Sequence, residues 1–150
     1  MTLKNVINFF ESLEAETSSK SEIKIYREFI QTITSLEAKN LSDAKIQSIE
    51  TKLDHLNLTS NPENRKKYFK KSLSAFKKYL RETFSLIPKG YYTTLYSGLG
   101  LSFGLLFGVA ILHNLERSLG ISLGLIGGML VGSIMGRSKD AQAKAAGNML

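Results

Sequence analysis

The chain has 150 residues, no cysteine and a formal net charge of +7 at pH 7. This length allows one small soluble domain beside a membrane segment, and the missing cysteines exclude disulfides, thiol nucleophiles and cysteine-based metal sites. The positive charge lies mainly in residues 65–89, which carry nine Lys and Arg against one acidic residue, whereas residues 1–64 carry seven against ten.

Glycine and charge divide the chain into two parts. Residues 1–89 lack glycine and are rich in Lys, Glu, Ser, Leu, Ile and Phe, which is typical of a water-soluble helical domain. Residues 91–136 contain only Glu116 and Arg117 as acidic or strongly basic side chains. Because no strand pattern of useful length occurs, we predict an all-α fold. A cytosolic bundle of about four helices, residues 1–87, precedes an antiparallel transmembrane helical hairpin.

Apolar residues at helical spacing predict three helices before residue 60. The first is short and precedes a break at "TSSKS". Ser19 and Glu22 have capping-box spacing and predict the start of the second helix, and Ser42 is the predicted cap of the third. The predicted buried stripes are Leu3, Val6, Ile7, Phe10 and Leu13; Ile23, Tyr26, Phe29, Ile30, Ile33 and Leu36; and Ile46, Ile49, Leu53 and Leu56.

A fourth, basic and juxtamembrane helix is predicted over residues 62–86. Asn61 is its expected cap and Pro62 its first residue, since proline has no amide to leave unsatisfied there. Pro88 and Gly90 are expected to end it. We expect its apolar side to complete a small helical bundle. The residues of that side are Phe69, Leu73, Phe76, Leu80 and Phe84.

Two uncharged stretches follow and predict membrane spans. Residues 91–112 would form a helix of about 33 Å, against a hydrocarbon core of about 30 Å, and residues 119–136 would form one of about 27 Å. The polar "HNLERS" between them is expected in water on the far side. The hairpin therefore occupies residues 88–136, and a short cytosolic tail occupies residues 137–150.

The flanking charges set the predicted orientation. Four cations between residues 77 and 89 precede the first span, and three cations between residues 137 and 144 follow the second. The positive-inside rule then places both termini in the cytoplasm. Tyr91, Tyr92 and Tyr96 are the predicted interface aromatics at the cytoplasmic headgroups. The first apolar cluster is too short for a secretory signal, and we expect the bacterial inner membrane as the location.

Glycine recurs every fourth residue in both predicted spans. Four residues make little more than one helical turn, so these glycines form a stripe along each helix. Small residues at this spacing let helix backbones approach closely in lipid. We predict that one set packs the hairpin and that the remainder faces another copy in a homo-oligomer. The helix-packing and oligomerisation residues are Gly100, Gly104, Gly108, Gly120, Gly124, Gly128, Gly132 and Gly136.

The stretches "GLGLSFGLLFG" and "GISLGLIGGMLVGSIMG" resemble the glycine-zipper helical hairpins of small bacterial membrane proteins, many of them uncharacterised. The resemblance is confined to the hairpin region. Such hairpins occur in oligomeric pores, in holin-like lytic proteins and in plain anchors. The resemblance therefore implies assembly in a membrane and no particular activity.

The basic helix is a predicted lipid-surface element. Its cations are Lys66, Lys67, Lys70, Lys71, Lys77, Lys78 and Arg81. Their position just before a membrane span favours attraction to anionic headgroups, worth about 1 kcal/mol per cation near the surface. An ordinary solvated helix face is the first alternative. Nucleic-acid binding through phosphate contacts and stacking on the interleaved aromatics is the less favoured second.

Residues that could carry catalysis form no recognisable set. His55 and His113 stand alone, and Asp43, Glu50 and Asp54 have the spacing of solvated carboxylates on a helix. The sequence has no Ser/His/Asp set, metal cluster or phosphate-binding glycine loop. We therefore expect no enzymatic activity, no cofactor and no metal.

Two functional hypotheses remain. The first is a pore-forming or membrane-perturbing homo-oligomer controlled by the cytosolic domain. Its lumen would be lined by Thr93, Ser97, Ser102, Ser122 and Ser133, because the spans offer no charge for a selective ion site. The alternative is a non-conducting anchor or scaffold whose helical domain recruits a protein partner, and a regulatory subunit of a larger membrane complex is a third class. The expected partners are anionic lipids, further copies of the chain and an unidentified protein.

Overall fold

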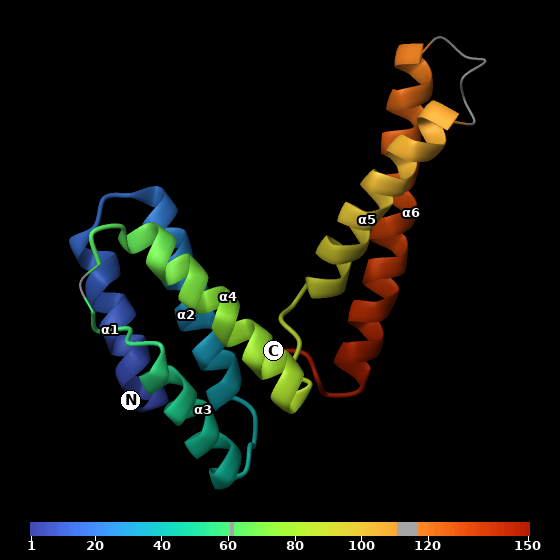
Figure 1. Cartoon of the computed structure of the whole chain (residues 1–150). Coiled ribbons are helices and arrows are strands. Elements are labelled where there is room, and N and C mark those ends of the chain that lie inside the picture. Colours follow the sequence, from blue (N-terminus) through green and yellow to red (C-terminus); the bar gives the residue numbers. More distant parts are fainter. Residues whose placement is uncertain (61, 111–116) are drawn as a thin grey trace. The chain divides into compact units, whose positions relative to one another are not determined.

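The computed structural model describes residues 1–60, 62–110 and 117–150. These residues form six α-helices and, within the same ranges, no β-strand beyond an isolated bridge between Ile87 and Met149 (Figure 1). The predicted all-α fold is confirmed. The chain divides into two compact units, which are Met1–Leu86 with Leu150 and Ile87–Met149.

The first unit contains four helices: α1 (Leu3–Glu16), α2 (Lys20–Glu37), α3 (Asp43–His55) and α4 (Arg65–Phe84). Helix α2 packs against both α1 and α4, and α3 packs against α4. Figure 1 shows these helices as a bundle. The predicted apolar stripes supply its core, with Ile7, Ile30, Ile46, Leu56 and Phe84 partly buried at its edge. Ile23 was wrongly placed in the stripe of α2, because it lines a surface groove and Ile25 is buried in the core.

An aromatic cluster from three helices occupies the centre of this core. Phe10 of α1 stacks on Phe29 of α2 with ring centroids 4.3 Å apart. Phe69 of α4 meets Phe10 edge-on at 5.3 Å and Tyr26 edge-on at 5.6 Å. Each such pair is worth about 0.5–1.5 kcal/mol beyond the apolar area that it buries. The cluster therefore joins α1, α2 and α4 at one point.

The starts of α2 and α3 lie where the sequence predicted them, but their hydrogen bonds differ. Ser19 and Ser42 occupy the N-cap positions without a side-chain cap bond. The predicted capping box is replaced by a relay in which the Ser19 amide donates to Thr17 Oγ1 at 3.2 Å and the Thr17 hydroxyl donates to Glu22 Oε2 at 2.9 Å. Thr17 accepts the hydrogen bond of the Ser19 amide in place of the Glu22 carboxylate because its hydroxyl lies between the two groups.

Helix α4 is shorter at both ends than the predicted residues 62–86. It begins at Arg65 because Asn64 is the cap, accepting a hydrogen bond from the Lys67 amide at 3.0 Å. The predicted cap, residue 61, lies outside the described residues. The helix ends at Phe84 because Ser85 adopts a left-handed conformation with φ of 55°. Pro88 therefore lies beyond the actual stop.

The second unit is built on α5 (Tyr91–Ala110) and α6 (Arg117–Ala145), which lie side by side as a hairpin (Figure 1). Helix α6 continues through residues 137–145, which were assigned to the tail. This stretch is rich in Ala, Lys and Gln, which are good helix formers, and it meets no breaker before Gly147. Residues 111–116 lie outside the described residues, and with them the end of the first predicted span, His113 and most of the predicted loop.

Candidate membrane hairpin

Helices α5 and α6 are long and apolar enough to cross a membrane. Only 11% of the most apolar window of α5 and 17% of that of α6 is buried within the protein. Large side chains such as Phe103, Leu106 and Ile134 are 58%, 64% and 67% exposed. A soluble protein seldom exposes so continuous an apolar surface. The two helices are therefore compatible with a membrane protein, and they differ from core helices, which bury their apolar residues.

The regularly spaced glycines lie in the interface between α5 and α6. A Cβ added at Gly100 or Gly104 would overlap the backbone carbonyl of Gly128 or Gly124, and the reverse additions overlap in the same way. At Gly108 it would lie 2.6 Å from the carbonyl oxygen of Gly120. The pairing runs in opposite directions along the two helices, as an antiparallel hairpin requires.

The interface continues toward the start of α5. A Cβ at Gly132 would overlap the carbonyl of Tyr96, and one at Gly136 would collide with the backbone of Thr93. Seven of the eight glycines singled out in the sequence thus face the partner helix of the same chain, and the eighth, Gly120, places its carbonyl against Gly108. Gly98 and Gly127 do not, since an added Cβ at either position meets nothing within 4 Å.

Hydroxyl groups add polar contacts to this interface. The Ser97 and Ser133 hydroxyls are 2.9 Å apart and join α5 to α6. Ser97 also lies 2.6 Å from the Thr93 carbonyl oxygen, within hydrogen-bond distance. Ser102 and Ser122, the other residues proposed for a lumen, donate to carbonyls one turn earlier in their own helices.

Asp140 of α6 caps the start of α5. Its carboxylate accepts hydrogen bonds from the amides of Tyr92 and Thr93 at 3.0 and 3.1 Å and from the Thr93 hydroxyl at 2.7 Å. The first amides of a helix have no partner within it, and a negative charge there is favoured by the helix dipole. The side chain is 9% exposed. One residue therefore satisfies the end of α5 and fixes the register of the hairpin.

Sequence reasoning did not single out Asp140. The signal was present, because Asp140 is the next position after Gly136 on the same four-residue spacing. A carboxylate at that position faces the same neighbouring helix as the glycines. Its task depends on α6 extending past Gly136, and the prediction placed residues 137–150 in a tail.

The predicted interface tyrosines lie in the first two turns of α5. Tyr91 and Tyr92 are in edge contact with centroids 5.3 Å apart, and Tyr92 and Tyr96 are 6.3 Å apart. All three are partly exposed. They are at the same end of the hairpin as Asp140.

The basic residues of α4 fall into two groups. Lys66, Lys67, Lys70, Lys71 and Lys78 are exposed, whereas the buried residues of α4 face the bundle. Lys77 forms an ion pair with Glu28 of α2, and Arg81 lies 3.8 Å from Glu82. The exposed lysines are available to a surface, whereas Lys77 contributes to the packing of the bundle.

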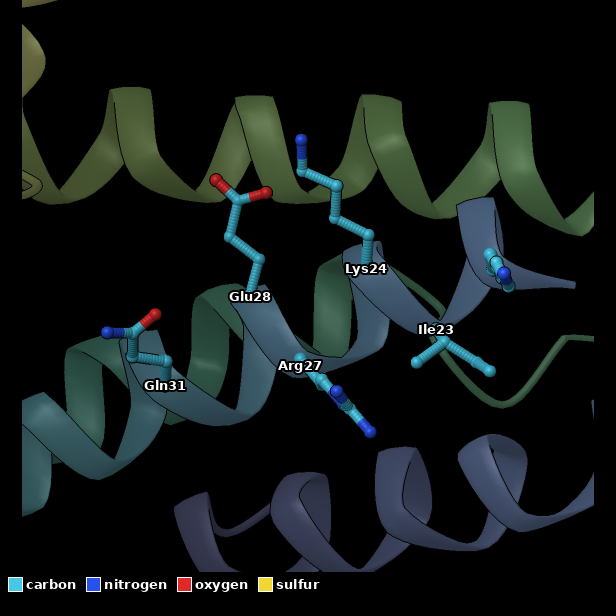
Figure 2. Close-up of a pocket in the computed structure, with 6 residues that line it drawn as sticks. Ile23, Lys24, Arg27, Glu28 and Gln31 are labelled. Atoms are coloured by element: carbon cyan, nitrogen blue, oxygen red, sulfur yellow. The ribbon is translucent and has the colours of Figure 1, made fainter.

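A groove of about 650 Å³ runs along α2 and is lined by Lys20, Ile23, Lys24, Arg27, Glu28 and Gln31. Figure 2 shows Arg27 pointing toward α1 and Glu28 pointing toward α4. Arg27 Nε donates to Glu14 at 2.8 Å, and Glu28 accepts from Lys77. The central charges of the groove are therefore engaged within the bundle.

Glu50, Asp54 and Tyr26 are further titratable residues with contacts inside the bundle. Glu50 accepts a hydrogen bond from the Leu3 amide at 3.1 Å, and Asp54 pairs with the amino group of Met1. Burial raises the pKa of Tyr26 above its usual value, and the Glu22 carboxylate adds to the increase. Within the described ranges, no group of three His, Cys, Asp or Glu residues could hold a metal.

A second cavity accompanies the hairpin. It is an apolar groove of about 570 Å³ beside the glycine interface, with Phe103, Phe107 and Val131 as walls and Gly127 in its lining.

Comparisons of the chain with family models, curated proteins and solved structures found no match.

Proposed function

We propose that the chain is an integral membrane protein in which the α5–α6 hairpin anchors the helical domain at the membrane surface. The carrying observation is that all eight regularly spaced glycines lie in the contact with the other helix of the same hairpin, seven by the direction of an added Cβ and Gly120 by its carbonyl. In lipid, close backbone contact and dispersion replace the hydrophobic effect as the force between helices. A hairpin packed in this way is a self-contained membrane unit, with its large apolar side chains turned outward.

The proposed orientation has both termini in the cytoplasm of a bacterial cell. Lys89, Arg137, Lys139 and Lys144 flank the two membrane helices at one end, which is the charge bias that retains a segment on the cytoplasmic side. The exposed lysines of α4 would then attract anionic headgroups. The role is not enzymatic, and the domain would present its surface to a protein partner.

A pore-forming homo-oligomer of the glycine-zipper type is the second candidate. The apolar groove with Gly127 in its lining favours it, because a second copy could approach closely there. The anchor has the stronger support. Of the residues expected to line a lumen, Thr93, Ser97 and Ser133 are engaged inside the hairpin.

Dye-loaded liposomes containing the full chain separate the two candidates. The anchor predicts that the protein floats with the liposomes, resists alkaline extraction, has the mass of one chain in detergent and releases no dye. The pore predicts release and a larger assembly, both lost in Gly127→Leu, which would fill the groove from a position where an added Cβ meets nothing within 4 Å. Protein extracted at alkaline pH would refute both.

A further inference from the structure

A small open pocket, lined by charged residues whose apolar stems form most of its surface, lies at the base of the hairpin, where α5 begins. It has a volume of about 250 Å³, far above the roughly 15 Å³ that one water needs. Lys89, Arg137 and Lys144 line it together with Asp140 and Thr93. Lys89 comes from the segment before α5, and the other two cations come from the last turns of α6. Residues distant in the sequence thus bring three positive charges to one cavity.

The single acid of the pocket offsets only one of the three positive charges. Both carboxylate oxygens of Asp140 accept hydrogen bonds from the start of α5. Among the described residues, none of the three cations has an ion-pair partner within 4.0 Å. Three like charges around one cavity repel each other. A bound anion would reduce that repulsion.

The backbone holds the two sides of the pocket together. The Ile87 amide donates to the Asn148 carbonyl at 2.8 Å, next to the bridge between Ile87 and Met149. Gly90 and Gly147 turn the chain at φ of 74° and 72°, which other residues seldom adopt. The segment that carries Lys89 is therefore tied to the end of α6.

We propose that this pocket binds the phosphate group of an anionic membrane lipid. The inference rests on the proposed membrane-spanning hairpin, because Arg137 directly follows the apolar stretch of α6 and Lys89 precedes the interface tyrosines of α5. Both cations then lie at headgroup depth. The Arg137 guanidinium provides a paired hydrogen-bond donor for phosphate oxygens, and the lysines act as point charges.

The test measures lipid retention by native mass spectrometry of the full chain in a neutral detergent. Phosphatidylglycerol and phosphatidylcholine are the probes, and Lys66, Lys67, Lys70 and Lys71 are changed to Gln throughout so that α4 does not contribute. We expect one phosphatidylglycerol bound at least tenfold more tightly than phosphatidylcholine. Lys89→Gln with Arg137→Gln and Lys144→Gln should abolish this preference.

Two control variants test whether the loss is specific to charges in the pocket. Lys4→Gln with Lys45→Gln and Lys139→Gln removes the same charge from exposed positions outside the pocket and should retain the preference. Lys89→Arg with Arg137→Lys and Lys144→Arg keeps the charge and should also retain it. Equal loss in the pocket variant and the outside variant would overturn the proposal.

Two further experiments distinguish a failure of the lipid site from a failure of the membrane hairpin. Inorganic phosphate at millimolar concentration should not displace the lipid, and full displacement would assign the pocket to free phosphate. Flotation of the same proteins with phosphatidylcholine liposomes tests the membrane hairpin alone. Insertion without headgroup preference would reject the lipid site only, whereas failure to insert would reject the proposed function.

Discussion

Gly127 and Gly128 are adjacent in α6 but have different surroundings. A Cβ at Gly128 would overlap the Gly100 carbonyl, whereas one at Gly127 meets nothing within 4 Å. Gly128→Ala should therefore weaken the hairpin by about 1–3 kcal/mol, as overpacking does. Gly127→Ala should be neutral or stabilising, because alanine favours a helix by about 1 kcal/mol over glycine.

Cysteine cross-linking measures this difference, since the chain has no cysteine of its own. Ser97→Cys with Ser133→Cys places two thiols where the hydroxyls are now 2.9 Å apart. The intramolecular disulfide should form readily in this background and in the Gly127→Ala variant. It should form roughly tenfold more slowly with Gly128→Ala, since about 1.4 kcal/mol corresponds to a factor of ten. Equal rates would show that the helices do not pack through these glycines.

Asp140 holds the first turn of α5 through its carboxylate. Asp140→Ala leaves the Tyr92 and Thr93 amides without their acceptor, which costs about 1–3 kcal/mol when such groups are buried. Hydrogen exchange over the first turn of α5 should accelerate about tenfold or more, and Asp140→Asn should have an intermediate effect because its carbonyl still accepts. Lys139→Ala, at the exposed neighbouring residue, is the control. Similar exchange in the two alanine variants would contradict the capping role.

At the scale of single helices, α4 has a buried side and a separate charged side. Lys66, Lys67, Lys70 and Lys71 are exposed and, in the described part of the chain, form no ion pair within 4.0 Å. Their replacement by Gln should leave the bundle folded and reduce docking of α4 on anionic vesicles. A fluorophore at Ser74→Cys with quencher lipids reports that docking in the full chain.

Screening by salt provides an internal check, because exposed charges interact weakly beyond about 10 Å at 0.1 M ionic strength. Quenching should fall with added salt in the wild type and be low at all salt concentrations in the Gln variant. Lys4, Lys20, Lys24 and Lys45 are also exposed, and their replacement by Gln is the matched control. If the control variant loses as much quenching, the effect is one of net charge and not of α4.

The helices themselves could be predicted from periodicity, whereas their ends depended on contacts between residues. The stripes of α1, α2 and α4 follow directly from apolar spacing, and their aromatic members meet in the core. The stop of α4 could not be predicted in the same way, because Ser85 has a left-handed conformation that serine rarely adopts. Leu86, which follows it, is buried, and this burial favours the turn.

The contacts of the candidate site were also predictable only in part. The glycine spacing predicted a close helix contact, and the structure places that contact within one chain. The cap from Asp140 needed knowledge of two helices at once, since the acid and the amides that it satisfies are 47 and 48 residues apart in the sequence. Such a pairing cannot be predicted from composition or from local sequence pattern.

For the molecule as a whole, the arrangement of charge and apolar surface predicts one orientation in the membrane. The cations near the hairpin base should remain in the cytoplasm, so both termini should be there and the junction between α5 and α6 should be on the opposite side. Because the chain lacks cysteine, single Cys substitutions report each position without background. Suitable exposed sites are Ser18, Ser118 and Ala146.

In intact cells, a membrane-impermeant maleimide should label Ser118→Cys and leave Ser18→Cys and Ala146→Cys unmodified until the cells are opened. Replacing Lys89, Arg137, Lys139 and Lys144 by Gln should reduce this asymmetry, since the charge bias near the ends of the membrane helices sets the orientation. Labelling of all three positions in intact cells would mean mixed orientations. Labelling of none would mean that the hairpin does not cross the membrane, and the anchor and the pore would then both be rejected by one measurement.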